Sequence, residues 1–418
     1  MSLRVSLGLL RDHDYRQLFN STLVSQFGFQ ITLLAIPLVA IVSLEATAFQ
    51  VGLLSALQTI AFLLVGLPAG VWVDRLLRRP VMIVADLARA ALLLTVPLAW
   101  WADALTIWHL CVVGFLQGVF TVMFDVAYQS VLPQLVGRDN LVEGNTKLES
   151  VRQTAQLGGP AVAGQLVRLM SAPVTLLLNS VALAVSAVFL LRVRTEEQAP
   201  DRRAAPHLFR EIGEGLRFVA GNSLLRAIAL CTGSANLFMA AFLAMLILFL
   251  ERTLGLGPAM IGLVLSVSGI GGLLGVFVAR RFADRVGQGP AIWMSAAATS
   301  TILLMPLVAA PGWRLWVGVA GYTAVSVGQV TYNLTQVSLR QAITPDHLRG
   351  RMNATMRFMA WGTLPLGALL GGALGTWFET RTALTVAAVG VSLTFLPVLL
   401  SPLRTLRTLP ADAAKQPA

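Results

Sequence analysis

The chain has 418 residues, of which 56% are hydrophobic and only 12% are charged, and its mean hydropathy is +0.74. Soluble proteins carry roughly 25% charged residues, so this composition indicates a protein embedded in lipid. The net charge of +11 would suggest nucleic-acid binding in a soluble protein. Here no basic segment stands apart from the apolar runs, so we expect no nucleic-acid partner.

Apolar runs of about 20 residues recur along the whole chain, and each is long enough to cross a hydrocarbon layer of about 30 Å. A single segment satisfies its own backbone in lipid only as a helix, so we predict an all-α membrane protein with twelve transmembrane helices. The predicted helices occupy residues 20–42, 49–73, 81–101, 105–132, 147–169, 172–192, 224–250, 258–279, 290–310, 313–339, 353–377 and 382–402.

A long polar connection divides these runs into two sets of six. We predict a cytoplasmic segment (1–19), an N-terminal six-helix bundle (20–192), a linker (193–223), a C-terminal six-helix bundle (224–402) and a cytoplasmic tail (403–418). Within the linker, apolar residues recur at helical spacing at Leu208, Ile212, Leu216 and Val219. This pattern predicts an amphipathic helix on the inner membrane surface. We interpret it as a tether between the two bundles, and the alternative is an effector-binding helix.

The basic residues are distributed unevenly between the two sides of the membrane. If the N-terminus lies inside, the cytoplasmic tails and loops hold 23 of the 31 Lys and Arg residues, and the outer loops hold four. This bias predicts a multi-pass protein of the cell membrane with both termini in the cytoplasm.

A stretch of the first half is repeated about 210 residues later. The matching positions are Gly52 and Gly262, Asp74-Arg75 and Asp284-Arg285, and Pro80 and Pro290. Internal repeats of this kind are typical of transporters built from two related halves, which hold their site at the interface between the repeats. We therefore interpret the chain as a carrier with two pseudo-symmetric bundles.

The repeated Asp-Arg pairs lie where predicted spans end. A carboxylate at this boundary can pair with arginines and can accept hydrogen bonds from a neighbouring helix N-terminus, and such a latch would stabilise one closure state. The predicted gating loops contain Gly70, Asp74, Arg75, Arg78, Arg79, Asp284 and Arg285.

Two predicted spans carry polar side chains on one helical face. In the fourth span these are Gln117, Thr121, Asp125 and Tyr128, and in the tenth they are Tyr322, Ser326, Gln329, Asn333, Gln336 and Arg340. An offset of 208 residues relates Thr121, Asp125 and Tyr128 to Gln329, Asn333 and Gln336. Such side chains can bind neighbouring helices together. Their matched positions favour a shared aqueous cavity for a substrate.

Asp125 is the acidic residue of the fourth-span stripe. A carboxyl group that exchanges a proton as access alternates would couple transport to the proton gradient, so Asp125 is the proton-coupling candidate. The alternative is a fixed ion pair of Asp125 with Arg152 or Arg138. Two other acid–base pairs lie three residues apart on predicted helices, Asp86 with Arg89 and Glu149 with Arg152, and we expect each to form a local ion pair.

Several of these motifs resemble those of a known family. Gly70-x-x-x-Asp74-Arg75-x-x-Arg78-Arg79 resembles the signature loop of the major facilitator superfamily, and Gly159-Pro160-Ala161-Val162-Ala163-Gly164 is similar to the antiporter motif of its drug:proton antiporters, with Ala163 in place of one glycine. Residues 81–89, 124–133 and 145–164 resemble the macrolide-efflux and siderophore-exporter branch. The chain departs from that branch after Gly28, where Phe29 replaces a frequent acidic residue.

This resemblance implies a fold in which the first, fourth, seventh and tenth helices line the cavity. Gln26 and Gln30 of the first span and Asn236 of the seventh would then complete the lining. The resemblance also implies export rather than uptake.

Sequence motifs for other chemistry are missing. The chain has no P-loop sequence, its only lysines are Lys147 and Lys415, and its four histidines lack metal-ligand spacing. Cys111 and Cys231 lie in predicted helices without CxxC spacing, so we interpret both as apolar fillers. We therefore expect no cofactor and no metal.

The sequence as a whole predicts a secondary active transporter that works as a monomer in the lipid bilayer. Its expected partners are protons and an amphipathic small molecule, such as a drug, a macrolide-like compound, a siderophore or another secondary metabolite. The alternatives are an importer or a lipid-moving carrier of the same fold, and a membrane-embedded enzyme.

Overall fold

A computed structural model describes residues 8–73, 76–137, 140–195 and 208–406. Within these residues the chain is helical and contains no strand, which confirms the all-α prediction. The helices divide between two compact units. Unit 1 contains residues 1–46, 57–204 and 257–266, and unit 2 contains residues 47–56, 205–256 and 267–418.

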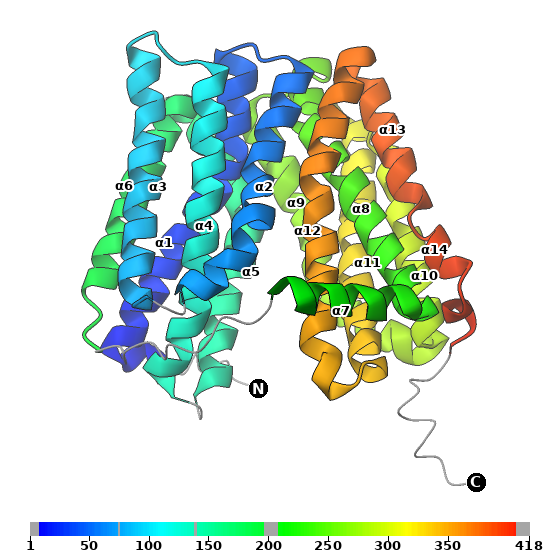
Figure 1. The fold of residues 1–418 in the computed structure, drawn as a ribbon. Coiled ribbons are helices and arrows are strands. Elements are labelled where there is room, and N and C mark those ends of the chain that lie inside the picture. The colour runs from blue at the N-terminus through cyan, green and yellow to red at the C-terminus, as the bar shows by residue number, and fades with distance from the viewer. Residues whose placement is uncertain (1–7, 74–75, 138–139, 196–207, 407–418) are drawn as a thin grey trace. The chain divides into compact units, whose positions relative to one another are not determined.

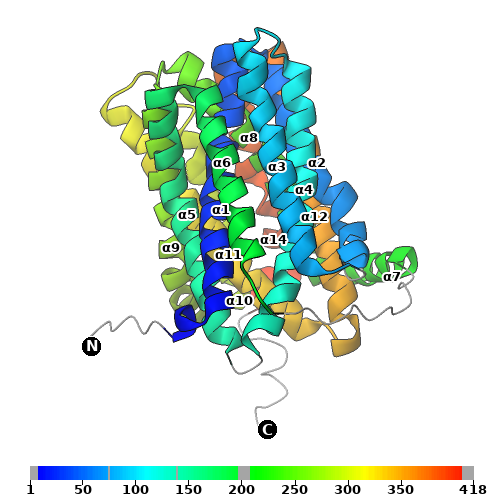
Figure 2. The same cartoon turned by 90° about the vertical axis from the view of Figure 1, so that its left-hand side faces the viewer.

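Unit 1 holds most of the first half of the chain. Its complete helices are α1 (His13–Leu38), α3 (Arg78–Trp101), α4 (Ile107–Val136), α5 (Leu141–Met170) and α6 (Ala172–Leu191). A short 3-10 turn (Gly8–Arg11) precedes α1, and a π-helical turn (Val39–Ser43) extends it. Helix α2 (Ala48–Val73) contributes its later part. In Figure 2, α1, α5 and α6 lie side by side, and their contacts confirm this packing.

Unit 2 holds most of the second half. Its helices are α7 (Leu208–Gly221), α8 (Ser223–Leu248), α10 (Gln288–Ala298), α11 (Trp313–Ile343), α12 (Asp346–Trp377), α13 (Thr380–Leu393) and α14 (Leu396–Leu399), together with most of α9 (Pro258–Val286). A π-helical turn (Phe249–Thr253) follows α8, and 3-10 turns follow α10 (Thr299–Leu304) and α14 (Pro402–Thr405). The amphipathic helix predicted in the linker is α7, which packs against α8 and α12 (Figure 1).

Each of the twelve predicted spans coincides with a helical segment. Within the described residues, nine segments are both long and apolar enough to cross a membrane. The segments that fall short are α5, α11 and the α10 segment. Helix α5 carries ion pairs and α11 carries the polar stripe, which lower their hydropathy, whereas α10 has only 11 residues before it tightens into a 3-10 turn. The architecture is consistent with twelve spans.

Side-chain caps and glycines set several helix boundaries. Asp12 accepts a hydrogen bond from the Tyr15 amide at the start of α1 (2.8 Å), and Asn222 accepts from the Leu224 amide at the start of α8 (3.0 Å). Gly137 follows α4 with φ +68°, and Gly287 separates α9 from α10 with φ +95°. Both glycines adopt backbone conformations that a side chain disfavours.

The repeated glycines allow two close helix contacts, one in each unit. In unit 1, a Cβ added to Gly164 of α5 would lie 3.1 Å from the Cα of Gly262 in α9. In unit 2, a Cβ added to Gly372 of α12 would lie 3.0 Å from the Cα of Gly52 in α2. Offsets of 208 and 210 residues relate the members of these pairs, so the two contacts are equivalent in the repeat. The glycines therefore permit close helix packing.

Candidate functional site

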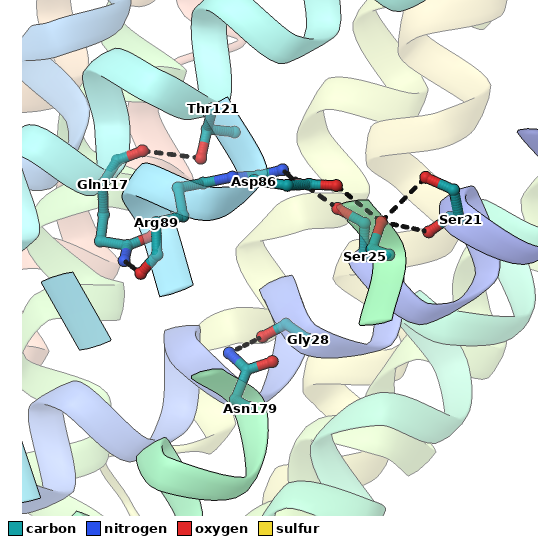
Figure 3. A network of polar contacts seen from close by, with 9 residues as sticks. Ser21, Ser25, Gly28, Asp86, Arg89, Gln117, Thr121 and Asn179 are labelled. Carbon is teal, nitrogen blue, oxygen red and sulfur yellow. Dashed lines mark hydrogen bonds and ion pairs between the residues drawn. The ribbon is translucent and has the colours of Figure 1, made fainter. Parts of the chain in front are cut away.

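A buried ion pair organises the interior of unit 1 (Figure 3). Asp86 and Arg89, three residues apart on α3, form this pair with side chains that are 0% and 4% exposed, which confirms the predicted pairing. The Ser186 hydroxyl of α6 donates to Asp86 Oδ2 at 2.6 Å and lies 2.8 Å from the Ser21 hydroxyl of α1. These contacts satisfy a carboxylate that would otherwise be costly to bury.

Arg89 also reaches α1 and α4. Its guanidinium donates to Ser25 Oγ of α1 at 3.3 Å and lies 4.7 Å from the ring centroid of Phe124 on α4. Gln117 of α4 donates to the Arg89 carbonyl at 2.7 Å, and Thr121 donates to the Gln117 carbonyl at 2.7 Å. Arg89 therefore connects the polar stripe of α4 to the core of the unit.

Unit 1 contains a cavity of about 560 Å³ beside this network, with walls from α1, α4 and α5. Five of the predicted cavity residues line it: Gln26, Gln30, Thr121, Asp125 and Tyr128. The charged side chains of its wall are Arg89, Asp125, Glu149 and Arg152.

Asp125 differs from the other charged groups of this wall in having no ion-pair partner among the residues that the structure describes. Arg152, one of its expected partners, donates instead to both carboxylate oxygens of Glu149, at 2.7 and 2.8 Å. This geometry confirms the predicted Glu149–Arg152 pair. The other expected partner, Arg138, lies outside the described residues.

Unit 2 contains a cavity of about 420 Å³, with walls mainly from α8, α11 and α12. Four predicted cavity residues line it: Asn236, Gln329, Asn333 and Gln336. Asn236 donates to the Ala360 carbonyl of α12 at 3.0 Å, and the Thr232 and Tyr332 hydroxyls lie 2.7 Å apart across α8 and α11. These bonds fix the three helices that form the wall.

The two cavities are built from equivalent positions of the repeat. An offset of 210 residues relates three residues of α1 to three of α8: Thr22, Gln26 and Phe29 correspond to Thr232, Asn236 and Met239. An offset of 208 residues relates α4 to α11, where Thr121, Asp125 and Tyr128 correspond to Gln329, Asn333 and Gln336. The same offset relates α5 to α12, where Asn145, Leu148 and Glu149 correspond to Asn353, Met356 and Arg357. Every one of these residues lines its own cavity. The internal repeat therefore includes the residues of the cavity walls as well as the gating motif.

Three predicted cavity residues lie elsewhere in their units. Gln117 lines a separate cavity of about 120 Å³ in unit 1. The Tyr322 ring lies 6.0 Å from that of Phe242, and Ser326 donates to the Tyr322 carbonyl at 3.3 Å. Neither Tyr322 nor Ser326 lines the unit 2 cavity. The stripe is long, and seven residues of helix place Tyr322 about 10 Å from Gln329 along the axis.

The predicted gating residues are only partly described. Gly70 belongs to α2, whereas Asp74 and Arg75 lie outside the described residues. Arg78 begins α3, and Arg79 donates to the Leu190 and Leu191 carbonyls at the end of α6, at 2.9 and 2.6 Å. A cation at a helix C-terminus is favoured by the helix dipole, so Arg79 fastens α3 to α6.

The second gating pair lies in a helix. Asp284 and Arg285 belong to the last turn of α9 and not to a loop as predicted, because α9 ends only before Gly287. Arg280 Nε lies 3.9 Å from Asp284 Oδ2, and both side chains are exposed.

The antiporter-like motif lies in α5. Gly159 packs closely against Gln30 of α1, and Gly164 packs against α9. Pro160 lies inside the helix, and the next amide, that of Ala161, donates to Ser266 Oγ of α9 at 2.9 Å. The motif thus brings α5 close to two neighbouring helices of unit 1.

Several cavity residues were not predicted as such. Arg89 and Glu149 were expected only as members of local ion pairs, and Arg357 and Asn353 were assigned no role. Extending the 208-residue offset from the stripes to Asn145 and Asn353 would have predicted that α5 and α12 also contribute to the cavity walls. The cysteines Cys111 and Cys231 are buried and free.

Comparison with known proteins adds to this geometry. A model of the Major Facilitator Superfamily matches residues 18–360, with a second match over 228–417. The chain belongs to the Major Facilitator Superfamily. This match confirms the resemblance of its motifs and the two-bundle fold class, and it makes the chain a membrane transporter.

Two relatives of this superfamily member are exporters by name. It is similar to the multidrug efflux pump Tap of Mycolicibacterium fortuitum, with 27% identity over 397 residues that cover 91% of this chain and 94% of that protein. It is also similar to the enterobactin exporter EntS of Salmonella typhi, with 24% identity over 402 residues that cover 95% of this chain and 94% of that protein. These relatives confirm the drug- and siderophore-exporter branch.

Solved structures of transporters share the fold. The nucleoside transporter NupG matches 92% of this chain and 98% of its own with a TM-score of 0.73 and 14% identity. A bacterial homologue of the iron transporter ferroportin matches 94% of this chain and 98% of its own with a TM-score of 0.74 and 18% identity.

Proposed function

We propose that this superfamily member is a secondary active exporter of the cytoplasmic membrane. Its substrate is an amphipathic small molecule, such as a drug, a macrolide-like compound, a siderophore or another secondary metabolite. The observation that carries the proposal is the pair of polar-lined cavities at equivalent positions of the repeat. The names of the relatives, a multidrug efflux pump and a siderophore exporter, support the direction of transport.

Equivalent binding surfaces on two repeats suit an alternating-access mechanism, in which the bundles move against each other around a substrate site. The polar residues of each wall would contact the polar groups of the substrate. Apolar residues of the walls, such as Phe29, Met239 and Met356, would contact its apolar body. We take the monomer as the working unit. The positive charge bias of the loops supports a cytoplasmic location for both termini.

Proton coupling is assigned to Asp125. Its side chain lines the unit 1 cavity, and within the described residues it forms no ion pair. A proton that moves with the cycle contributes about 2.3 kcal/mol per 100 mV, enough for about fifty-fold accumulation of substrate. Asp125 is thus available to gain and lose a proton, whereas Asp86 and Glu149 are held by arginines.

Cells that express the chain and are loaded with the amphipathic dye rhodamine 6G test the proposal. The expected result is faster loss of cell-associated dye than in cells with an empty vector, and a protonophore is expected to abolish the difference. Net dye uptake would contradict export and favour an importer. Movement of labelled phospholipid, with no effect on the dye, would favour a lipid-moving carrier.

A further inference from the structure

We propose that the unit 2 cavity binds an anionic group of the substrate, held by Arg340 of α11 and Arg357 of α12. The inference rests on the proposed function for its ligand, the exported molecule, and it narrows that ligand to amphipathic molecules that carry an anionic group. Both arginines line the cavity, although they belong to different helices.

Arg340 is a half-buried cation without a counterion among the described residues. It is the last residue of the polar stripe of α11 and lies one turn after Gln336. Its Nε atom is buried and has no hydrogen-bond partner among the described residues. Removing a charged group from water is costly unless an opposite charge or hydrogen bonds compensate. A carboxylate, sulfonate or phenolate in the cavity would supply both.

Arg357 reaches the same cavity from α12. Its guanidinium lies 5.5 Å from the ring centroid of Trp361, one turn further along the helix, and Trp361 is also part of the wall. A guanidinium that lies over an aromatic face is oriented by the ring while its N–H donors stay available for an anion. Planar guanidinium donors match the geometry of carboxylates, so this arrangement suits an anion.

Neutral donors and the absence of acids complete the site. Asn353 and Gln336 line the wall, and no Asp or Glu belongs to it within the described residues. Gln336 is only 3% exposed, and its Oε1 atom has no hydrogen-bond partner in that part of the chain. Among the described residues, the wall therefore carries two positive charges and no negative charge.

Comparison with the equivalent cavity of unit 1 indicates that this charge is specific to unit 2. Asp125 is replaced by Asn333 and Glu149 by Arg357 at the 208-residue offset, and the position of Leu132 becomes Arg340. In unit 1 both wall arginines are engaged by carboxylates, Arg89 by Asp86 and Arg152 by Glu149. The repeat has thus diverged into one cavity whose arginines are paired with carboxylates and another whose described wall has arginines but no carboxylate.

The test compares two dyes that differ in one group. Rhodamine 19 carries a free carboxylate, and rhodamine 6G is its ethyl ester. Binding is measured by fluorescence anisotropy on purified full-length protein in phosphatidylcholine nanodiscs, which contain no anionic lipid to compete. Because a hydrogen bond to a charged group is stronger than one to a neutral group, we expect the carboxylate form to bind at least about tenfold more tightly.

Variants then assign this preference to the two arginines. Arg340→Gln and Arg357→Gln are expected to lose most of the preference for rhodamine 19, while their affinity for rhodamine 6G changes little. Arg357→Lys is expected to retain part of that preference. The matched control is Arg314→Gln, which removes an arginine that also lies over a tryptophan (Trp313, 5.7 Å) but is not part of the cavity wall. Melting temperatures identify any variant that fails to fold, and the lysine variant then decides the outcome.

Equal affinity for the two dyes, no binding of rhodamine 19, or equal losses for both dyes in the Gln variants would overturn the inference. The measurement does not depend on transport. An arginine-dependent preference without efflux of either rhodamine 19 or rhodamine 6G from cells would therefore refute the exporter proposal and leave the anion site standing.

Discussion

Arg89→Met is expected to lower the stability of the protein by about 3–5 kcal/mol, because it leaves the Asp86 carboxylate buried without its counterion. Asp86 is fully buried, and of its neighbours only Ser186 Oγ would remain as a described hydrogen-bond donor. Removal of one member of a buried pair costs far more than the pair contributes, since the other member loses water without compensation. Loss of the Phe124 and Ser25 contacts adds to the effect.

Thermal unfolding in detergent, followed by intrinsic tryptophan fluorescence, measures this loss. The matched control is Arg152→Met, which breaks an ion pair of the same spacing with side chains that are 58% and 50% exposed. Exposed pairs contribute only about 0–1 kcal/mol, so a small shift is expected there. The double variant Asp86→Asn/Arg89→Met is expected to recover much of the lost stability. Similar melting shifts for the two single Arg→Met variants would contradict the role of the buried pair.

Asp125→Asn is expected to abolish proton-driven accumulation of substrate while substrate counterflow continues. Asparagine fills nearly the same space but carries no exchangeable proton, and it is the residue at the equivalent position of unit 2, Asn333. At a potential of 100 mV the loss of one coupled proton would remove about fifty-fold of accumulation.

Proteoliposomes with an imposed proton gradient separate these two activities. Accumulation of rhodamine 6G should fall to the level of protein-free liposomes in the variant, and exchange of internal for external dye without a gradient should persist. Asp103→Asn is the control, because Asp103 is exposed in the connection between α3 and α4. Unchanged gradient-driven accumulation in Asp125→Asn would exclude Asp125 as the coupling site.

Much of the fold could be predicted from the sequence because its strongest signals are local. Apolar length predicted a helical segment for each of the twelve spans, and the spacing of Leu208 to Val219 predicted α7. The shortening of α10 could not be predicted, because its apolar run continues through Leu304 and only the hydrogen bonding changes from α to 3-10. The end of α9 was also missed. The apolar run ends at the charged residue Arg280, but residues 281–286 contain no residue that breaks a helix, so the helix continues beyond the run.

The candidate site could be predicted as far as helical periodicity reaches. Spacing brought Thr121, Asp125 and Tyr128 onto one face, and all three line the unit 1 cavity. Contacts between helices were beyond this reasoning. Gln117 bonds to a carbonyl 28 residues away, Ser186 bonds to a carboxylate 100 residues away, and nothing in the local sequence joins them. For the same reason, the shared cavity of Arg340 and Arg357 emerged only from the arrangement of α8, α11 and α12 around it.

The central claim is that the polar face of α4 lines a water-filled substrate cavity in unit 1 and that the polar face of α11 lines one in unit 2. Reaction with a membrane-impermeant methanethiosulfonate tests it directly, in a background with Cys111 and Cys231 replaced by alanine. Asn333→Cys is compared with Leu334→Cys, the next residue of α11, whose side chain is 45% exposed at the surface of the helix bundle. Because thiolates react in water, Asn333→Cys should react at least about tenfold faster, and substrate should slow it. Equal rates, or faster reaction at Leu334→Cys, would contradict the account.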